Sequence, residues 1–152
     1  MNDELKKTQH SAFSTDNSPK ALSTQNSTKS QAQNSIVDRS FAFAVRVVKL
    51  CKYIEKQDRV SCTLANQFLR SGTSIGANVE ETQAGQSKAD FVAKMSIARK
   101  EARETHYWLR LLKESEIVPE SQLSEIVQEA DEIIRILTAI VKTAQARNSN
   151  DK

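Results

Sequence analysis

The stretch of residues 64–81 has helical periodicity and almost no charge, which leaves few folds open to the chain. At 100° per residue its large apolar side chains fall within a sector of roughly 60°, which makes one stripe that must be buried. These side chains are Leu64, Phe68, Ile75 and Val79. Only three of the eighteen residues are charged, so we expect the helix to be covered on more than one side, by its own bundle and by a neighbouring subunit.

Two glycines lie four residues apart in the same stretch, Gly72 and Gly76. A glycine within a helix costs about 1 kcal/mol relative to alanine. The pair therefore indicates that another backbone or a ligand approaches the helix closely at this point.

A polar stripe runs beside the apolar one and has two interpretations. Its members are Gln67, Arg70, Ser74, Asn78 and Glu81. In the preferred interpretation the stripe forms a buried network between helices, because buried charges persist only when they are paired. Arg70 would then pair with Glu81, or with Glu101 or Glu104 further along the chain. In the alternative, Arg70, Ser74 and Asn78 contact a ligand.

The length and composition favour one helical domain. The chain has 152 residues, and its three glycines, two prolines and 5% aromatic residues are typical of long helices rather than of a β-rich fold. Residues 1–35 are rich in Ser, Thr, Asn, Gln and Lys, so we expect a disordered tail, which either solubilises the protein or folds on a partner. Residues 36–147 are expected to form the folded domain, and residues 148–152 a disordered C-terminus.

Four amphipathic segments follow one another within the expected domain. They cover about residues 38–57, 58–84, 87–116 and 119–147. Asp58 or Ser61 is the expected N-cap of the second segment, and Ser87 that of the third. Because the connections are only a few residues long, the sequence predicts an all-α fold, an antiparallel up-down-up-down four-helix bundle.

Charge is distributed unevenly along the chain, although the net charge is only +3. Residues 39–59 contain six basic and two acidic residues, and residues 116–147 six acidic and three basic ones. A basic helix face is either simply solvated or a binding surface, and here Tyr53 interrupts the first one, as on many nucleic-acid surfaces. The candidate phosphate contacts are Arg46, Lys49, Lys52, Lys56, Arg99, Arg103 and Arg110.

Residue patterns for catalysis are missing from the sequence. His106 is the only histidine outside the tail, no Glu-x-x-His pair for a metal is present, and the two glycines lie within a helix rather than in a phosphate-binding loop. Cys51 and Cys62 show no metal-binding spacing and are expected to be reduced thiols. We therefore expect a cytoplasmic protein without enzymatic activity, metal or cofactor.

Three groups of residues carry a resemblance to a known family. They are the run Gln67-Phe-Leu-Arg-Ser-Gly-Thr-Ser-Ile-Gly-Ala-Asn-Val-Glu-Glu81, then Lys88-Ala-Asp-Phe91, and then Ile97-Ala98 with Glu104-Thr-His-Tyr-Trp-Leu109. About residues 36–145 resemble the bacterial four-helix bundle family, also called the large-subunit ribosomal RNA intervening-sequence protein family. The glycine that often follows the final glutamate of the run is Thr82 here, so the end of that helix is expected to differ.

The resemblance implies a ring-like homopentamer without known catalytic activity. The family is similar to the accessory variability determinant of diversity-generating retroelements, a pentameric bundle that binds nucleic acid and associates with a reverse transcriptase. Oligomerisation would also multiply each basic face fivefold, so that weak phosphate contacts add up.

These observations lead to one hypothesis and two alternatives. The hypothesis is a non-enzymatic oligomeric bundle that binds structured RNA, or nucleic acid more generally, through its basic surfaces. The first alternative is an accessory protein of a diversity-generating retroelement that binds its reverse transcriptase and template RNA. The second is a structural oligomer or a small-ligand protein in which Arg70, Asn78 and Glu81 line the site.

Overall fold

The structure is a computed structural model that describes residues 35–85 and 87–150. Within these residues it contains four α-helices, one short 3-10 helix and no strand. The elements are α2 (Ile36–Ile54), α3 (Arg59–Glu81), the 3-10 helix η1 (Thr82–Ala84), α4 (Lys88–Glu114) and α5 (Glu120–Asn150). The predicted tail lies outside the described residues except for Ser35, the N-cap of α2.

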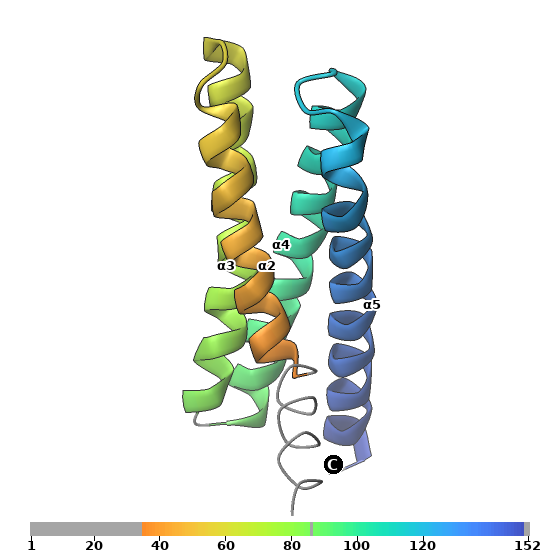
Figure 1. Ribbon diagram of the computed structural model, residues 1–152. Coiled ribbons are helices and arrows are strands. Elements are labelled where there is room, and N and C mark those ends of the chain that lie inside the picture. The colour runs from red at the N-terminus through yellow and green to blue at the C-terminus, as the bar shows by residue number, and fades with distance from the viewer. Residues whose placement is uncertain (1–34, 86, 151–152) are drawn as a thin grey trace, which may run out of the picture.

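The four helices run alternately up and down, as the sequence predicted (Figure 1). Helix α2 packs against α3 and α5, and α4 packs against the same two helices from the other side. Helices α2 and α4 are therefore diagonally opposite each other. Of the four neighbouring pairs, α2 and α5 are the least closely packed.

Side-chain caps fix where the helices begin. The carboxylate of Asp58 accepts hydrogen bonds from the backbone nitrogens of Val60 (2.8 Å) and Ser61 (3.1 Å), which makes Asp58 the N-cap of α3. The hydroxyl of Ser87 likewise accepts from the backbone nitrogen of Asp90 at 3.1 Å and caps α4. Helix α5 continues to Asn150, three residues past the predicted end of the folded domain at residue 147.

The core is a single cluster of apolar side chains from all four helices. Phe68, Ile75 and Val79 of the stripe that the sequence singled out on α3 are completely buried, and Leu64 is half-buried at its edge. Between α3 and α4 the core also holds a polar contact, in which the hydroxyl of Thr105 donates to that of Ser71 at 3.0 Å. The single proton of the Thr105 hydroxyl is shared between Ser71 and the backbone oxygen of Glu101 (2.8 Å), and the hydroxyl of Ser71 donates to the backbone oxygen of Phe68 (3.3 Å), so neither is left unsatisfied.

The two glycines of α3 face α2, where the helices approach closely. A Cβ atom on Gly72 would lie 2.7 Å from a methyl carbon of Val47, and one on Gly76 would lie 3.3 Å from the backbone oxygen of Ser40. The glycine pair thus accommodates a second helix of the same chain. Of the two possibilities that the sequence left open, close approach by a backbone is the one that the structure contains.

Helix α2 begins at Ile36 and ends at Ile54, whereas residues 38–57 were predicted, and the ends of α3 and α4 also differ from their predicted positions. Helix α3 ends at Glu81, three residues before the predicted end, and the chain continues for one turn as η1. The extended backbone of Gly85 ends η1 at Ala84, where the helix was predicted to end. Helix α4 ends at Glu114, two residues early. There Glu116 takes a left-handed backbone (φ 57°), and the nitrogen of Ile117 bonds back to the oxygen of Leu112 at 3.2 Å. A turn of this kind usually has glycine at the left-handed position. Because Glu116 stands there instead, the sequence did not predict that the helix ends at this point.

Candidate nucleic-acid interface

The second half of α2 carries the first group of predicted phosphate contacts. Lys49, Lys52 and Lys56 are exposed, and none of them forms an ion pair with another described residue. Arg46 is half-buried, with Nη2 3.4 Å from Oε2 of Glu125, whose side chain is 88% exposed. An ion pair so open to water contributes little, so Arg46 can exchange this carboxylate for a phosphate.

Helix α4 carries the second group. Arg103 and Arg110 are exposed and Arg99 is half-buried, and these three guanidinium groups also have no ion-pair partner among the described residues. His106 lies on the same side of the helix, with Nε2 3.3 Å from Oδ1 of Asp131 on α5. The ridge of positive charge on α4 is thus accessible to a polyanion.

The two groups do not form one surface. Because α2 and α4 are diagonally opposite in the bundle, α5 lies between the two groups. Arg46 of α2 pairs with Glu125 of α5, and His106, on the ridge of α4, pairs with Asp131 of α5. A single protomer therefore offers two separate basic faces. Helical periodicity places residues on a face of one helix but does not say which helices are neighbours, so the sequence did not reveal this separation.

A groove between α2 and α5 was not predicted. It has a volume of about 280 Å³ and is lined by Arg46, Lys49, Leu50, Tyr53, Gln122 and Ile126. We call it the α2–α5 groove. Its floor is apolar and its α2 wall is basic, and Tyr53, whose side chain is 42% exposed, belongs to that wall. Tyr53 on the basic face was the only lining residue that the sequence singled out. Gln122 and Ile126 come from a distant part of the chain, so the sequence did not indicate that they lie beside it.

Further along the same seam, ion pairs join α2 to the acidic helix α5. A guanidinium nitrogen of Arg39 lies 2.9 Å from Glu129 and 2.5 Å from Glu132. The hydrogen bond from Arg39 holds the pKa of the Glu132 carboxyl below its usual value. This part of the seam is anionic, so a polyanion is expected to contact only the basic half of α2.

The predicted polar network forms in part, at the edge between α3 and α4. Arg70 pairs with Glu104 through a short hydrogen bond and lies 3.6 Å from Glu101. The indole nitrogen of Trp108 donates to the same Glu104 carboxylate at 3.3 Å. Burial disfavours the charged form of Glu104, but the hydrogen bonds from Arg70 and Trp108 outweigh it and lower the pKa of this carboxyl.

The other members of the polar stripe lie outside this cluster. Glu81 pairs with Lys94 of α4, and the amide of Asn78 donates to the backbone oxygen of Ser74 at 2.8 Å within α3. Gln67 is exposed and bonds no other described side chain. The side chain of Arg70 is 52% exposed, so the expectation of a buried network was wrong. The stripe faces outward because α4 covers only its edge.

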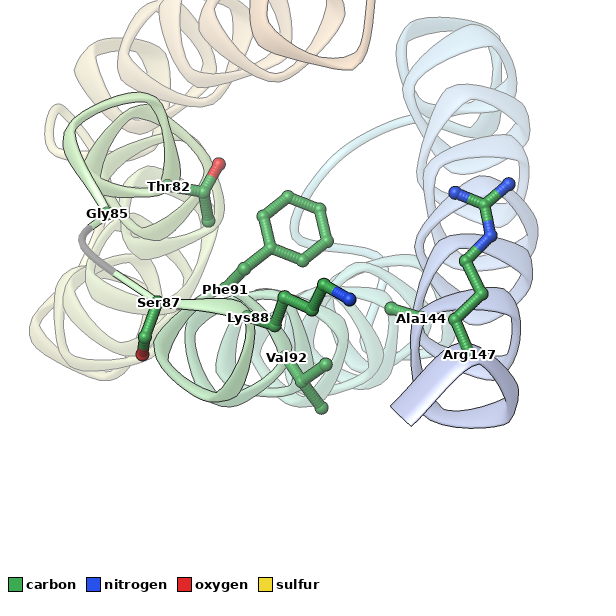
Figure 2. Close-up of a pocket in the computed structure, with 8 residues that line it drawn as sticks. All are labelled: Thr82, Gly85, Ser87, Lys88, Phe91, Val92, Ala144 and Arg147. Atoms are coloured by element: carbon green, nitrogen blue, oxygen red, sulfur yellow. The ribbon is translucent and has the colours of Figure 1, made fainter. Parts of the chain in front are cut away.

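A second pocket lies at the end of the bundle where η1 meets α4 (Figure 2). Its volume is about 330 Å³, and the ring of Phe91 and the side chain of Val92 provide its apolar wall. Lys88 and Arg147 supply positive charge from α4 and α5, and the Lys88 side chain extends toward Ala144. This pocket is far from the predicted phosphate contacts on α2.

The described residues hold no grouping of three metal-ligating side chains and no helix long and apolar enough to cross a membrane. Both cysteines are free thiols. Burial raises the pKa of the Cys51 thiol to about 11, and its sulfur lies 3.5 Å from the backbone oxygen of Ala65. Cys51 is therefore a protonated core residue rather than a reactive one.

Comparison with protein families gives a match over residues 32–139, more than half of the chain, to the family described as 23S rRNA-intervening sequence protein. The chain belongs to this family. The match spans the motif at residues 67–81 and confirms the resemblance drawn from it. The relation to the accessory variability determinant of diversity-generating retroelements stays a prediction.

A solved structure supports membership in the 23S rRNA-intervening sequence protein family. It is a protein of unknown function from Bacteroides thetaiotaomicron, assigned to the S23 ribosomal protein family. It is 43% identical in sequence, with a TM-score of 0.65, over 71% of this chain and 99% of that chain. No curated protein matches the chain.

Proposed function

We propose that this member of the 23S rRNA-intervening sequence protein family is a non-enzymatic, cytoplasmic oligomer that binds structured RNA through the basic residues of α2 and α4. The observation that carries the proposal is the set of exposed or half-exposed cations on these helices that have no ion-pair partner among the described residues. Six of the seven predicted phosphate contacts belong to this set, and the seventh, Arg46, has only an exposed partner. Cations without carboxylate partners are available to phosphates.

An apolar stripe on the first half of α2 supports an oligomer. Phe41 (62% exposed), Val45 (38%) and Val48 (37%) follow one another at helical spacing on its outer surface. Thr73 and Ala77 of α3 come directly after the two glycines that face α2, so they extend this surface without adding charge. An uncharged surface of this kind is typical of a protein contact. We propose that it contacts a second copy of the chain, within the ring of five that the family resemblance implies.

The three lysines of α2 come after its apolar stripe along the helix, and Arg46 is the one predicted phosphate contact that lies within the span of the stripe. The stripe ends at Val48, and the lysines begin at Lys49. A subunit contact through the first half would leave the second half open to RNA. Several copies would then present their α2 and α4 faces together, which makes up for the separation of the two faces on one protomer.

A second candidate function uses the same apolar stripe. In a diversity-generating retroelement it would bind a reverse transcriptase, and contact with the template RNA would be secondary. Because the accessory variability determinant is itself pentameric, the oligomeric state does not distinguish this function from the first. Binding of a reverse transcriptase by the purified protein, lost in Phe41→Glu, would distinguish it. A third possibility is a small ligand, for which the pocket of Figure 2 offers more room than the exposed Arg70 cluster.

The proposal is tested by reversing charge on both basic faces. In Lys49→Glu/Lys56→Glu/Arg103→Glu we expect RNA affinity to fall at least tenfold at about 0.1 M salt, with a shallower salt dependence, because phosphate contacts are lost. The matched control is Arg135→Glu/Lys142→Glu/Arg147→Glu, which changes the net charge equally on α5. Equal losses in both variants would mean that only net charge matters. Unchanged affinity in the first variant would contradict the assignment of the interface.

A further inference from the structure

We propose that the α2–α5 groove receives an unpaired nucleobase of the bound RNA, which stacks on Tyr53 while Arg46 and Lys49 hold the neighbouring phosphates. The proposal rests on the proposed RNA-binding function and names the part of an RNA that this site takes. In this proposal the groove binds a base, whereas the rest of the basic surface contacts only the sugar–phosphate backbone.

The arrangement of the groove suits a flat apolar group beside a charged one. Leu50 from α2 and Ile126 from α5 form an apolar floor, and the two cations stand on the α2 wall next to Tyr53. A base inserted here would cover the floor and one face of the tyrosine, while its phosphates stay at the mouth near the cations. The groove exists because α2 and α5 are the least closely packed neighbouring helices.

Tyr53 is available for stacking. Its side chain is 42% exposed, and the one ring pair found in the described residues joins Tyr107 to Trp108, with centroids 5.0 Å apart. No other aromatic ring thus occupies the face of Tyr53. Base–aromatic stacking tolerates any base, because every base has a π-face.

The geometry selects unpaired nucleotides over a duplex. In an A-form helix the bases are stacked on one another and the major groove is too narrow for side chains, so only loops, bulges and ends can offer a free base. The amide of Gln122 at the groove wall both donates and accepts hydrogen bonds, so it can meet the polar edge of different bases. We therefore expect a preference for unpaired positions with little preference for sequence.

Glu125 opposes binding at this site. It lies 3.4 Å from Arg46, and its negative charge is close to where the phosphates would sit. Removing that charge in Glu125→Gln should free Arg46 and tighten binding to an RNA with an unpaired loop. Glu114→Gln on α4 removes the same charge outside the groove and should give a smaller gain, since general electrostatic attraction to RNA is then the only change.

The experiment compares two RNAs of equal length, a hairpin with an unpaired loop containing 2-aminopurine and a fully paired duplex. For the loop RNA we expect Tyr53→Ala to weaken binding about fivefold or more and to abolish the change in 2-aminopurine fluorescence that wild-type protein causes. Tyr53→Phe keeps the ring and should retain both. Duplex affinity should be the same in all three proteins, which also shows that the variants are folded.

The remaining outcomes separate this proposal from the function on which it rests. If Tyr53→Ala binds both RNAs as wild type does, or loses affinity for both equally, the groove does not take a base, and backbone binding stands. An equal loss in Tyr107→Ala, whose ring lies on α4, would also overturn the assignment to the groove. If the wild-type oligomer binds neither RNA at low salt, the RNA-binding function itself fails.

Discussion

Glu116 is the residue whose backbone conformation is least suited to its side chain. It is the one described non-glycine residue with a positive φ, and it closes α4 with the turn that glycine usually supplies. The left-handed conformation costs about 1–2 kcal/mol in a residue with a Cβ atom, whereas glycine adopts it readily. Because the position holds glutamate and not glycine, the sequence did not predict the turn.

Replacing this residue should stabilise the protein. We expect Glu116→Gly to raise the free energy of unfolding by about 0.5–1 kcal/mol, since the relief of strain exceeds the extra entropy of glycine in the unfolded chain. Chemical denaturation followed by circular dichroism measures this. Ser115→Gly is the control, because Ser115 has a negative φ and gains nothing from glycine. A loss of stability in Glu116→Gly would show that its side chain contributes more than the strain costs.

At the scale of the helices, the contact between α2 and α3 depends on Gly72. We expect Gly72→Ala to lower the free energy of unfolding by about 1–2 kcal/mol, because the new methyl group would overlap the buried, β-branched Val47. Gly76→Ala should have a smaller effect, since its nearest atom is 3.3 Å away.

A double-mutant cycle with Val47→Ala tests the cause. If the overlap with Val47 is responsible, the cost of Gly72→Ala should be smaller in the Val47→Ala background. Identical costs in both backgrounds would place the strain elsewhere in the α2–α3 contact.

The helices were predictable and their mutual arrangement was not. The periodicity of residues 64–81 identified α3 and its buried face, and Ser87 was correctly predicted as the N-cap of α4. For α3 the sequence left Asp58 and Ser61 open, and the structure has Asp58. The α2–α5 groove, by contrast, joins Tyr53 to Gln122, and nothing local to either residue indicates that they meet. The partners of Arg70 were predicted as a choice among three carboxylates, but its exposure depends on how far α4 covers α3.

At the scale of the whole molecule, the apolar stripe on α2 is expected to hold the copies together. Phe41→Glu should convert the proposed oligomer into single chains of 17.0 kDa without loss of helical content, because the side chain is exposed in the protomer and contributes nothing to its core. Light scattering coupled to size-exclusion chromatography measures the mass. Val60→Glu changes another exposed apolar residue, on α3, and should leave the oligomer intact. An oligomer that survives Phe41→Glu would place the subunit contact on another face.

The alternating directions of the four helices have a consequence for the electric field of the protein. Each end of the bundle contains two helix N-termini and two C-termini, so the partial charges of the aligned peptide dipoles cancel there. The backbone then makes almost no contribution to the potential that an approaching polyanion meets. Long-range attraction of a polyanion therefore comes from lysine and arginine side chains alone. Substituting these side chains can abolish the attraction completely.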